Sequence, residues 1–262
     1  MNAKKSLGQH FLTSKAVISD IIEVAALDDT DHVLEIGPGK GILTQALLDT
    51  GAHVVAVELD QELSRDLEKQ FSGEIDSGQL EIVEKDVLSL EVEEYFKDDY
   101  KVVANIPYYI TGKILRKFLG GTPQPKQMVL LVQKEVAQRI VARDKKESLL
   151  SLAVKVYGEP RIIRKVPRHL FDPQPNVDSA VISIENISRG FFDTLKEDRF
   201  FSVIRAGFGH KRKKLSNNLE ELYDKKAAEV ALQEMERSVN TRAEDLSLHE
   251  WKELINSLEK RG

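Results

Sequence analysis

The chain has 262 residues, a length that suits two domains or one large α/β domain with an appendage. Hydrophobic residues make up 41% of it and charged residues 31%, which is typical of a globular protein. Because there is no cysteine, the composition excludes a disulfide scaffold, a cysteine zinc site, an iron–sulfur cluster and a thiol nucleophile. The sequence shows no apolar run of signal-peptide type and none near the roughly 20 residues of a membrane span, so we expect a cytoplasmic protein.

The charged residues are unevenly distributed. The net charge is −5, from 38 basic and 43 acidic residues, so the total charge does not indicate nucleic-acid binding. Residues 205–214, however, include five basic residues and no acid, and residues 155–168 include five basic residues against one glutamate. Nucleic-acid binding needs a basic face rather than a basic protein. The candidate contacts are Lys211, Arg212, Lys213 and Lys214, for which a solvated helix face is the alternative.

The hydrophobic pattern predicts a helix at residues 16–27 and then an alternation of strands and helices. Strands are predicted at residues 32–36, 53–59, 80–86, 100–106, 128–133, 162–166 and 179–186. Helices are predicted at residues 42–50, 61–71, 110–119, 134–142 and 148–157. Such an alternation implies right-handed crossovers and a parallel sheet. Since no helix separates the last two strands, we expect them to pair antiparallel and to give seven strands with a reversed edge.

The strand pattern ends near Ile187, and residues 191–262 have the pattern of several short helices. We therefore place a domain boundary near residues 187–190. The expected fold is α/β, with a Rossmann-like seven-stranded sheet whose last strand is antiparallel in residues 1–187. Residues 188–262 are expected to form a small all-α C-terminal domain.

A glycine-rich turn with the sequence GPGKG occupies residues 37–41, directly after the first sheet strand. In open α/β sheets, ligands bind outside the carboxyl ends of the strands, and glycine lets the backbone approach them. The turn is not a P-loop, because a glycine and not Ser or Thr follows Lys40. The G-x-G-x-G spacing also differs from the dinucleotide fingerprint, and Pro38 has no N–H to offer a pyrophosphate. The turn therefore favours an uncharged or zwitterionic ligand.

Acidic residues end the next two strands. Glu58 ends the second strand and can accept hydrogen bonds from both hydroxyls of a ribose. Asp86 ends the third and can accept from the exocyclic amine of an adenine. A nucleoside without phosphate, held by two carboxylates and a loop containing Gly37 and Gly39, describes S-adenosylmethionine. The alternative is that the glycine turn is only structural.

The fourth strand ends in Asn105-Ile106-Pro107-Tyr108. The exocyclic nitrogen of adenine is a poor nucleophile, because its lone pair is delocalised into the ring. Acceptors such as the side-chain oxygen of Asn105 and a main-chain carbonyl stiffened by Pro107 would favour a pyramidal, more nucleophilic nitrogen. Tyr108 offers a face on which a flipped base can stack. The plain alternative is a turn that follows a strand.

These motifs together resemble the RNA adenine-N6 dimethyltransferases, which are class I enzymes that use S-adenosylmethionine. The resemblance covers nearly the whole chain and includes an N-terminal L-G-Q-H-F-L, E-I-G-P-G-K-G and N-I-P-Y. Three later segments resemble the small-subunit rRNA branch: F-D-P-Q-P-N-V-D-S-A, K-R-K-K-L-S-N-N-L and N-T-R-A-E-D-L-S. The other close branch contains the erythromycin-resistance methylases that act on large-subunit rRNA.

The resemblance implies further site residues. His10 and Leu12 match the N-terminal segment that lines the cofactor site, although the family often has asparagine where His10 stands. The other matching cofactor positions are Gly37, Glu58, Asp86 and Asn105. Phe171 matches the aromatic residue expected to sandwich the target base opposite Tyr108, whereas periodicity alone would place it in the core as readily. The family commonly shows N-L-P-Y-N, and Ile106 and Tyr109 depart from that pattern.

The resemblance implies dimethylation of N6 of two adjacent adenines, in a hairpin near the 3′ end of small-subunit rRNA within an assembling 30S particle. We expect a monomer with neither a metal nor a membrane partner. Within the same class, the large-subunit resistance methylase is the alternative. Two other classes stay open: a nucleotide-binding oxidoreductase, disfavoured by the glycine spacing, and a non-catalytic RNA-binding assembly factor, disfavoured by the intact cofactor residues.

Overall fold

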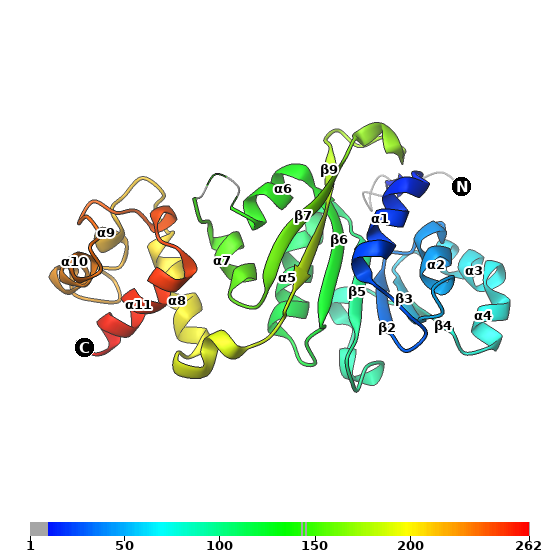
Figure 1. Cartoon of the computed structure of the whole chain (residues 1–262), viewed down its shortest axis with the longest axis horizontal. Coiled ribbons are helices and arrows are strands. Elements are labelled where there is room, and N and C mark those ends of the chain that lie inside the picture. The colour runs from blue at the N-terminus through cyan, green and yellow to red at the C-terminus, as the bar shows by residue number, and fades with distance from the viewer. Residues whose placement is uncertain (1–9, 143, 145, 262) are drawn as a thin grey trace. The chain divides into compact units, whose positions relative to one another are not determined.

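The structure is a computed structural model that describes residues 10–142, 144 and 146–261 (Figure 1). Residues 7–9 of the N-terminal motif lie outside this part of the chain. Contacts divide the chain into two compact units, of which the first comprises residues 1–137 and 158–187 and the second residues 138–157 and 188–262. The division between residues 187 and 188 lies at the domain boundary expected near residues 187–190. Residues 138–157, expected in the first domain, belong instead to the second unit.

A seven-stranded sheet forms the centre of the first unit. Its strands are β2 (His32–Ile36), β3 (His53–Glu58), β4 (Leu80–Glu84), β5 (Lys101–Asn105), β6 (Gln127–Gln133), β7 (Glu159–Val166) and β9 (Ser179–Glu185), in the spatial order β4-β3-β2-β5-β6-β9-β7. The strands β2 to β6 pair in parallel, and β9 pairs antiparallel with both β6 and β7. The last strand is thus antiparallel, as expected, but it lies one place inside the edge, which β7 forms.

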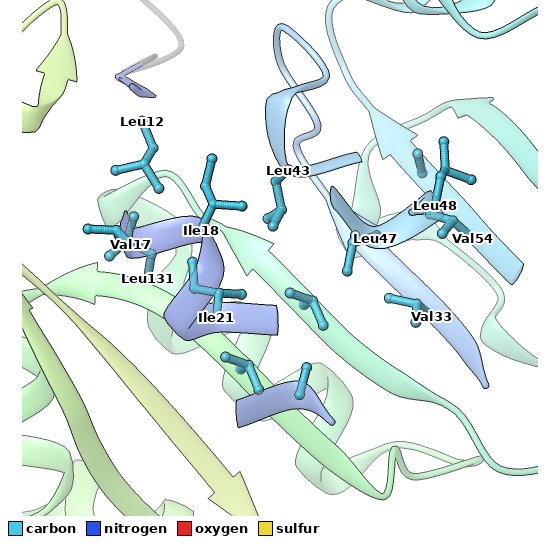
Figure 2. Close-up of a cluster of buried hydrophobic side chains, with 14 of the residues drawn as sticks. Leu12, Val17, Ile18, Ile21, Val33, Leu43, Leu47, Leu48, Val54 and Leu131 are labelled. Atoms are coloured by element: carbon cyan, nitrogen blue, oxygen red, sulfur yellow. The ribbon is translucent and has the colours of Figure 1, made fainter. Parts of the chain in front are cut away.

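Helices follow the parallel strands as the alternation predicted. Those of the first unit are α1 (Lys15–Ala25), α2 (Ile42–Leu48), α3 (Gln61–Gln70), α4 (Ser72–Asp76) and α5 (Thr111–Gly120), and α6 (Lys134–Ile140) crosses the division. Helix α1 buries Val17, Ile18 and Ile21, which share one face at a spacing of three and four residues. Figure 2 shows these side chains in the apolar cluster that α1 and α2 form with the sheet.

The parallel arrangement determines where the polar residues of the sheet gather. Strands β2, β5 and β6 are buried almost along their whole length, as is typical of parallel strands covered on both faces. Because parallel strands end at the same edge of a sheet, Glu58 at the end of β3 and Asn105 at the end of β5 face the same region.

A short two-stranded sheet, not expected from the sequence, joins the N-terminal segment to the F-D-P-Q-P loop. Strand β1 (Phe11–Leu12) pairs antiparallel with β8 (Phe171–Asp172). The main-chain N–H and the hydroxyl of Thr13 both donate to Leu170 O at 2.9 Å and extend this connection. Two residues are too few to show the alternation that reveals a strand in sequence.

The second unit is helical. Its helices are α7 (Leu149–Lys155), α8 (Glu197–Gly207), α9 (Leu215–Asn218), α10 (Lys225–Glu234) and α11 (Leu248–Glu259). Helix α7 packs against α8, and Lys146 Nζ lies 2.5 Å from the Glu244 carboxylate. These contacts explain why residues 138–157 belong to this unit. Within the part of the chain that the structure describes, no helix is long and apolar enough to cross a membrane.

Candidate active site

A cavity of about 240 Å³ lies at the carboxyl ends of β2, β3, β4 and β5. It brings together most of the site residues predicted from the sequence. Those that line it are His10, Gly37, Gly39, Glu58, Asp86, Asn105, Pro107 and Tyr108. All of them belong to the first unit.

The glycine amides of the turn already donate hydrogen bonds, either within the turn or to strand β3. The N–H of Gly37 donates to Val57 O at 2.9 Å, and that of Gly41 donates to Pro38 O at 3.0 Å. The N–H of Gly39 donates to the Glu58 carboxylate at 3.2 Å. Since Pro38 has no N–H, these four positions present no array of free donors to a pyrophosphate. This geometry opposes a dinucleotide cofactor.

Glu58 is a buried carboxylate with capacity left for a ligand. Its side chain is 6% exposed, and its Oε1 accepts from the Asp60 N–H at 2.9 Å while Oε2 accepts from Gly39. Burial raises the pKa of Glu58, and the main-chain N–H donors oppose that shift. Because each carboxylate oxygen can accept two hydrogen bonds, both ribose hydroxyls of a nucleoside could still bind here.

Asp86 has a different environment. It is exposed, follows β4, and caps the short helix η2 (Val87–Ser89) by accepting from the Leu88 N–H at 2.9 Å through Oδ1. The cap holds the carboxylate at the cavity wall. Its remaining acceptor capacity suits the exocyclic amine of an adenine.

Asn105 is held by the N-terminal segment. Its Nδ2 donates to His10 O at 3.0 Å, and the residue is half-buried at the end of β5. This bond orients the amide, so Oδ1 is the atom left to accept a hydrogen bond from a substrate amine. The sequence pattern placed Asn105 in the site, but it did not reveal that a main-chain carbonyl 95 residues away orients it.

Tyr108 opens the short helix η4 (Tyr108–Ile110) and is held at both its ring and its hydroxyl. The hydroxyl lies 2.6 Å from Ser179 Oγ, and burial raises the pKa of Tyr108. The His10 ring stacks on the Tyr108 ring, with centroids 6.0 Å apart and 22° between the planes. His10 Nδ1 in turn lies 2.7 Å from Pro173 O. His10 thus supports the aromatic wall of the cavity.

Two of the predicted catalytic and cofactor residues do not line this cavity. Phe171 is 4% exposed and Leu12 is 6% exposed, and both belong to the hydrophobic core cluster. They are cross-strand partners in β1 and β8, so the same pairing turns both side chains inward. The structure therefore places Phe171 in the core cluster, the alternative that periodicity left open, and not among the residues that line the cavity with Tyr108.

The basic run in the second unit is a turn and not a helix face. It lies between α8 and α9, and all four side chains are exposed: Lys211, Arg212, Lys213 and Lys214. The buried Asn218 holds this turn by donating through Nδ2 to Gly207 O at 2.6 Å and His210 O at 3.1 Å. In the described part of the chain, none of the four basic side chains forms an ion pair.

Sequence reasoning missed Glu35, which lies in the middle of a buried strand. Its side chain is 1% exposed, and no hydrogen-bond partner reaches either oxygen among the described residues. The Thr44 hydroxyl lies close enough to favour the ionised form of Glu35, but the two side chains do not meet the geometry of a hydrogen bond. Burial raises the pKa of Glu35 to about 8, and Glu58 adds a repulsive contribution. A side cavity of about 30 Å³ adjoins Glu35, Gly37 and Asn105.

Comparison with known protein families gives one match over almost the whole chain. The model of the family described as ribosomal RNA adenine dimethylase matches residues 1–260. The ribosomal RNA small subunit methyltransferase A of Fusobacterium nucleatum is 41% identical over 98% of this chain and 98% of its own length. The protein of the same name from Dehalococcoides mccartyi is 42% identical over 97% of this chain and 88% of its own.

Solved structures agree with this match. A dimethyladenosine transferase from Plasmodium falciparum is 27% identical and superposes with a TM-score of 0.83, over 97% of this chain and 98% of its own. The 23S rRNA methyltransferase ErmE is also 27% identical, with a TM-score of 0.79 over 95% of this chain and 99% of its own. The fold is therefore similar to that of a dimethyladenosine transferase and of a 23S rRNA methyltransferase, whereas the Fusobacterium and Dehalococcoides relatives are both named as small subunit methyltransferases.

Proposed function

Since the chain belongs to the ribosomal RNA adenine dimethylase family, we propose that it dimethylates N6 of two adjacent adenines near the 3′ end of small-subunit rRNA. The proposed substrate is an assembling 30S particle, which puts the reaction in the cytoplasm, and the proposed enzyme is a monomer that uses no metal. The observation that supports this most directly is the convergence of Glu58, Asp86, Asn105 and Tyr108 on one cavity at neighbouring strand ends.

S-adenosylmethionine is the cofactor that this cavity fits. Bound there, it would supply an electrophilic methyl group on a sulfonium. Glu58 would hold the ribose hydroxyls through its remaining acceptor sites, and Asp86 would accept from the adenine amine. The turn at Gly37 and Gly39 would lie against the methionine portion. Its amide groups already donate hydrogen bonds to protein acceptors, so the turn needs no phosphate as an acceptor.

The proposed chemical step depends on the acceptors at the end of β5. Asn105 Oδ1 and the main-chain carbonyl of Ile106 would accept the two hydrogens of the target amine. This favours a pyramidal nitrogen with a localised lone pair. Pro107, with φ −58° and ψ 131°, restricts the conformation of Ile106 and so holds that carbonyl in place. No strong base is needed, because the methylated nitrogen can lose its proton to water.

Tyr108 would stack on the flipped adenine. Its hydroxyl bond to Ser179 and the His10 ring limit how far the aromatic ring can turn, so the stacking face stays in place between turnovers. Phe171 has no part in this proposal, because its side chain is packed in the core. The basic turn 211–214 would contact rRNA phosphates.

The deciding experiment uses labelled S-adenosylmethionine with immature 30S particles and, in parallel, protein-free 23S rRNA. The expected product is dimethyladenosine at two adjacent positions near the 3′ end of 16S rRNA, with no label in 23S rRNA. Label in 23S rRNA alone would support the resistance-methylase alternative. Binding to the particles without any label would support the non-catalytic assembly factor.

A further inference from the structure

Tyr109, which follows Tyr108, is an exposed aromatic residue at the cavity. Its side chain is 64% exposed, more than any other large hydrophobic side chain in the described part of the chain. Isolated exposed hydrophobic residues are common in proteins and carry no meaning by themselves. Tyr109 differs because it lines the cavity that also contains Asn105 and Tyr108, so its exposed ring belongs to the proposed site.

Two lysines line the same cavity. Lys113 is exposed on the first turn of α5, four residues after Tyr109, and Lys85 is half-buried directly after β4. Among the residues that the structure describes, neither ammonium group has a carboxylate partner. Other lysines of this unit do have one: Lys101 lies 3.0 Å from Asp31. The cavity wall therefore carries two lysines that form no ion pair among the described residues, beside an exposed aromatic ring.

An aromatic face beside ammonium groups matches the two parts of a single-stranded nucleotide. The ring can stack on a base of any sequence, and the ammonium groups can replace the counterions of its phosphates. Tyr108 is half-buried and anchored at Ser179, which suits a single base inserted for reaction. Tyr109 has no such anchor among the described residues and is more exposed, which suits a base that stays outside the cavity.

We propose that Tyr109 stacks on the nucleotide next to the target adenine and that Lys113 and Lys85 contact the adjoining phosphates. The inference rests on the proposed function and adds to it a binding subsite for the flanking nucleotide, within the first unit. Tyr109 is one of the two departures from the N-L-P-Y-N pattern that the family commonly shows.

The test compares four variants in methylation of immature 30S particles, in binding of these particles at several salt concentrations, and in calorimetric binding of S-adenosylmethionine. Tyr109→Leu removes the ring, Tyr109→Phe retains it, and Lys113→Gln removes one charge. Lys69→Gln is the matched control, because Lys69 is exposed on α3 and does not line the cavity.

Tyr109→Leu should raise KM for the particle roughly 5- to 150-fold with a smaller change in kcat, the range expected when one base–aromatic stack is removed. Tyr109→Phe should stay within about twofold of the wild type, since stacking needs the ring and not the hydroxyl. Lys113→Gln should lower the salt slope of particle binding by about 0.7–0.9, and Lys69→Gln should leave it unchanged. Cofactor affinity should be the same in all four variants.

The proposal is overturned if Tyr109→Leu leaves KM unchanged, or if Tyr109→Phe is as impaired as Tyr109→Leu. It is also overturned if Tyr109→Leu weakens S-adenosylmethionine binding as much as it weakens particle binding, because the ring would then cover the cofactor. These results differ from failure of the proposed function, in which the wild-type protein itself would not methylate the particles.

Discussion

At the scale of single residues, the orientation of one amide decides what the site can do. Asn105 could present either its oxygen or its NH₂ group to a substrate amine. The His10 carbonyl accepts from Nδ2 and thereby leaves the oxygen for the substrate. An amide turned the other way would place a donor against a donor. The N-terminal segment is therefore part of the proposed chemistry through its main chain.

Replacing Asn105 by Ala should leave the fold intact and slow methyl transfer by roughly 10²–10³-fold, as for loss of one hydrogen-bonding group that acts on a transition state. Affinity for the 30S particle should change much less, because phosphate contacts elsewhere dominate it. Single-turnover methylation at saturating substrate measures the step directly. A wild-type rate in that assay would remove Asn105 from the chemical step.

Replacing Glu58 by Ala should weaken S-adenosylmethionine binding by about 1.5–3 kcal/mol, the range for hydrogen bonds to a charged group. Calorimetry checks this, with Glu68→Ala as a control because Glu68 is exposed on the neighbouring helix α3. If the Glu58 variant bound the cofactor as tightly as the control, the ribose hydroxyls would have to be held elsewhere.

Glu35 predicts a pH dependence of stability. Its pKa of about 8 in the folded protein exceeds the ordinary value of 4.5, so the folded state binds this proton more tightly than the unfolded state. The free energy of unfolding should therefore fall as pH rises from about 4.5 to about 8, because in this range Glu35 is ionised in the unfolded chain, whereas in the folded protein burial without a partner among the described residues keeps it protonated. Glu35→Gln should remove this component and be more stable than the wild type at pH 8.

Urea denaturation of the wild type and of Glu35→Gln from pH 5 to pH 9 measures how the difference in their free energies of unfolding depends on pH. All other titrating groups are the same in the two proteins, so this difference reports on Glu35. Parallel stability curves for the two proteins would mean that Glu35 has the same proton affinity in the folded and unfolded states.

At the scale of elements, the two-residue strands β1 and β8 organise one side of the site. Phe11 in β1 packs against the glycine turn so closely that a Cβ on Gly39 would lie 2.8 Å from its ring. Gly39 has a φ of +60°, which also favours glycine. The pairing of β1 with β8 thus connects the N-terminal segment, the cofactor loop and the segment around Phe171.

Phe171 offers a direct test of this arrangement. Phe171→Ala should lower the free energy of unfolding by about 3–5 kcal/mol, the range for truncating a buried aromatic residue. Phe171→Leu, which keeps most of the volume, should fold and retain nearly the wild-type kcat. A stable Phe171→Leu protein with kcat reduced a hundredfold or more would instead support the base-stacking role that the family resemblance implies.

At the scale of the whole molecule, charge is distributed locally and not globally. The chain has a net charge of −5, yet the turn at 211–214 presents four exposed basic side chains. The buried Asn218 side chain holds the main chain before the turn in place through two hydrogen bonds. The position of the basic cluster is therefore fixed by the packing of the second unit. Local phosphate contacts can supply RNA affinity whatever the total charge.

Changing the four basic residues of this turn to Gln should weaken binding to 30S particles and lower the salt slope by about 0.7–0.9 for each phosphate that the turn no longer neutralises. Cofactor affinity should not change, because the cavity lies in the first unit. Filter binding at several salt concentrations measures the slope. An unaltered affinity and slope would make the turn a solvated surface and direct attention to the basic residues between 155 and 168.

The sequence by itself determined the seven sheet strands and the residues at their carboxyl ends. Hydrophobic runs and glycine turns are local signals, and parallel topology makes strand ends converge. Glu58, Asp86, Asn105 and Tyr108 could therefore be assigned to one site before any coordinates.

Only the tertiary structure decided the positions that depend on pairing between distant segments. The β1–β8 pairing buries Leu12 and Phe171, and contacts with α8 bring residues 138–157 into the second unit. Burial of Glu35 without a partner among the described residues is likewise a property of its packed surroundings. Such features leave no local pattern, because burial and pairing arise when segments far apart in the chain pack together.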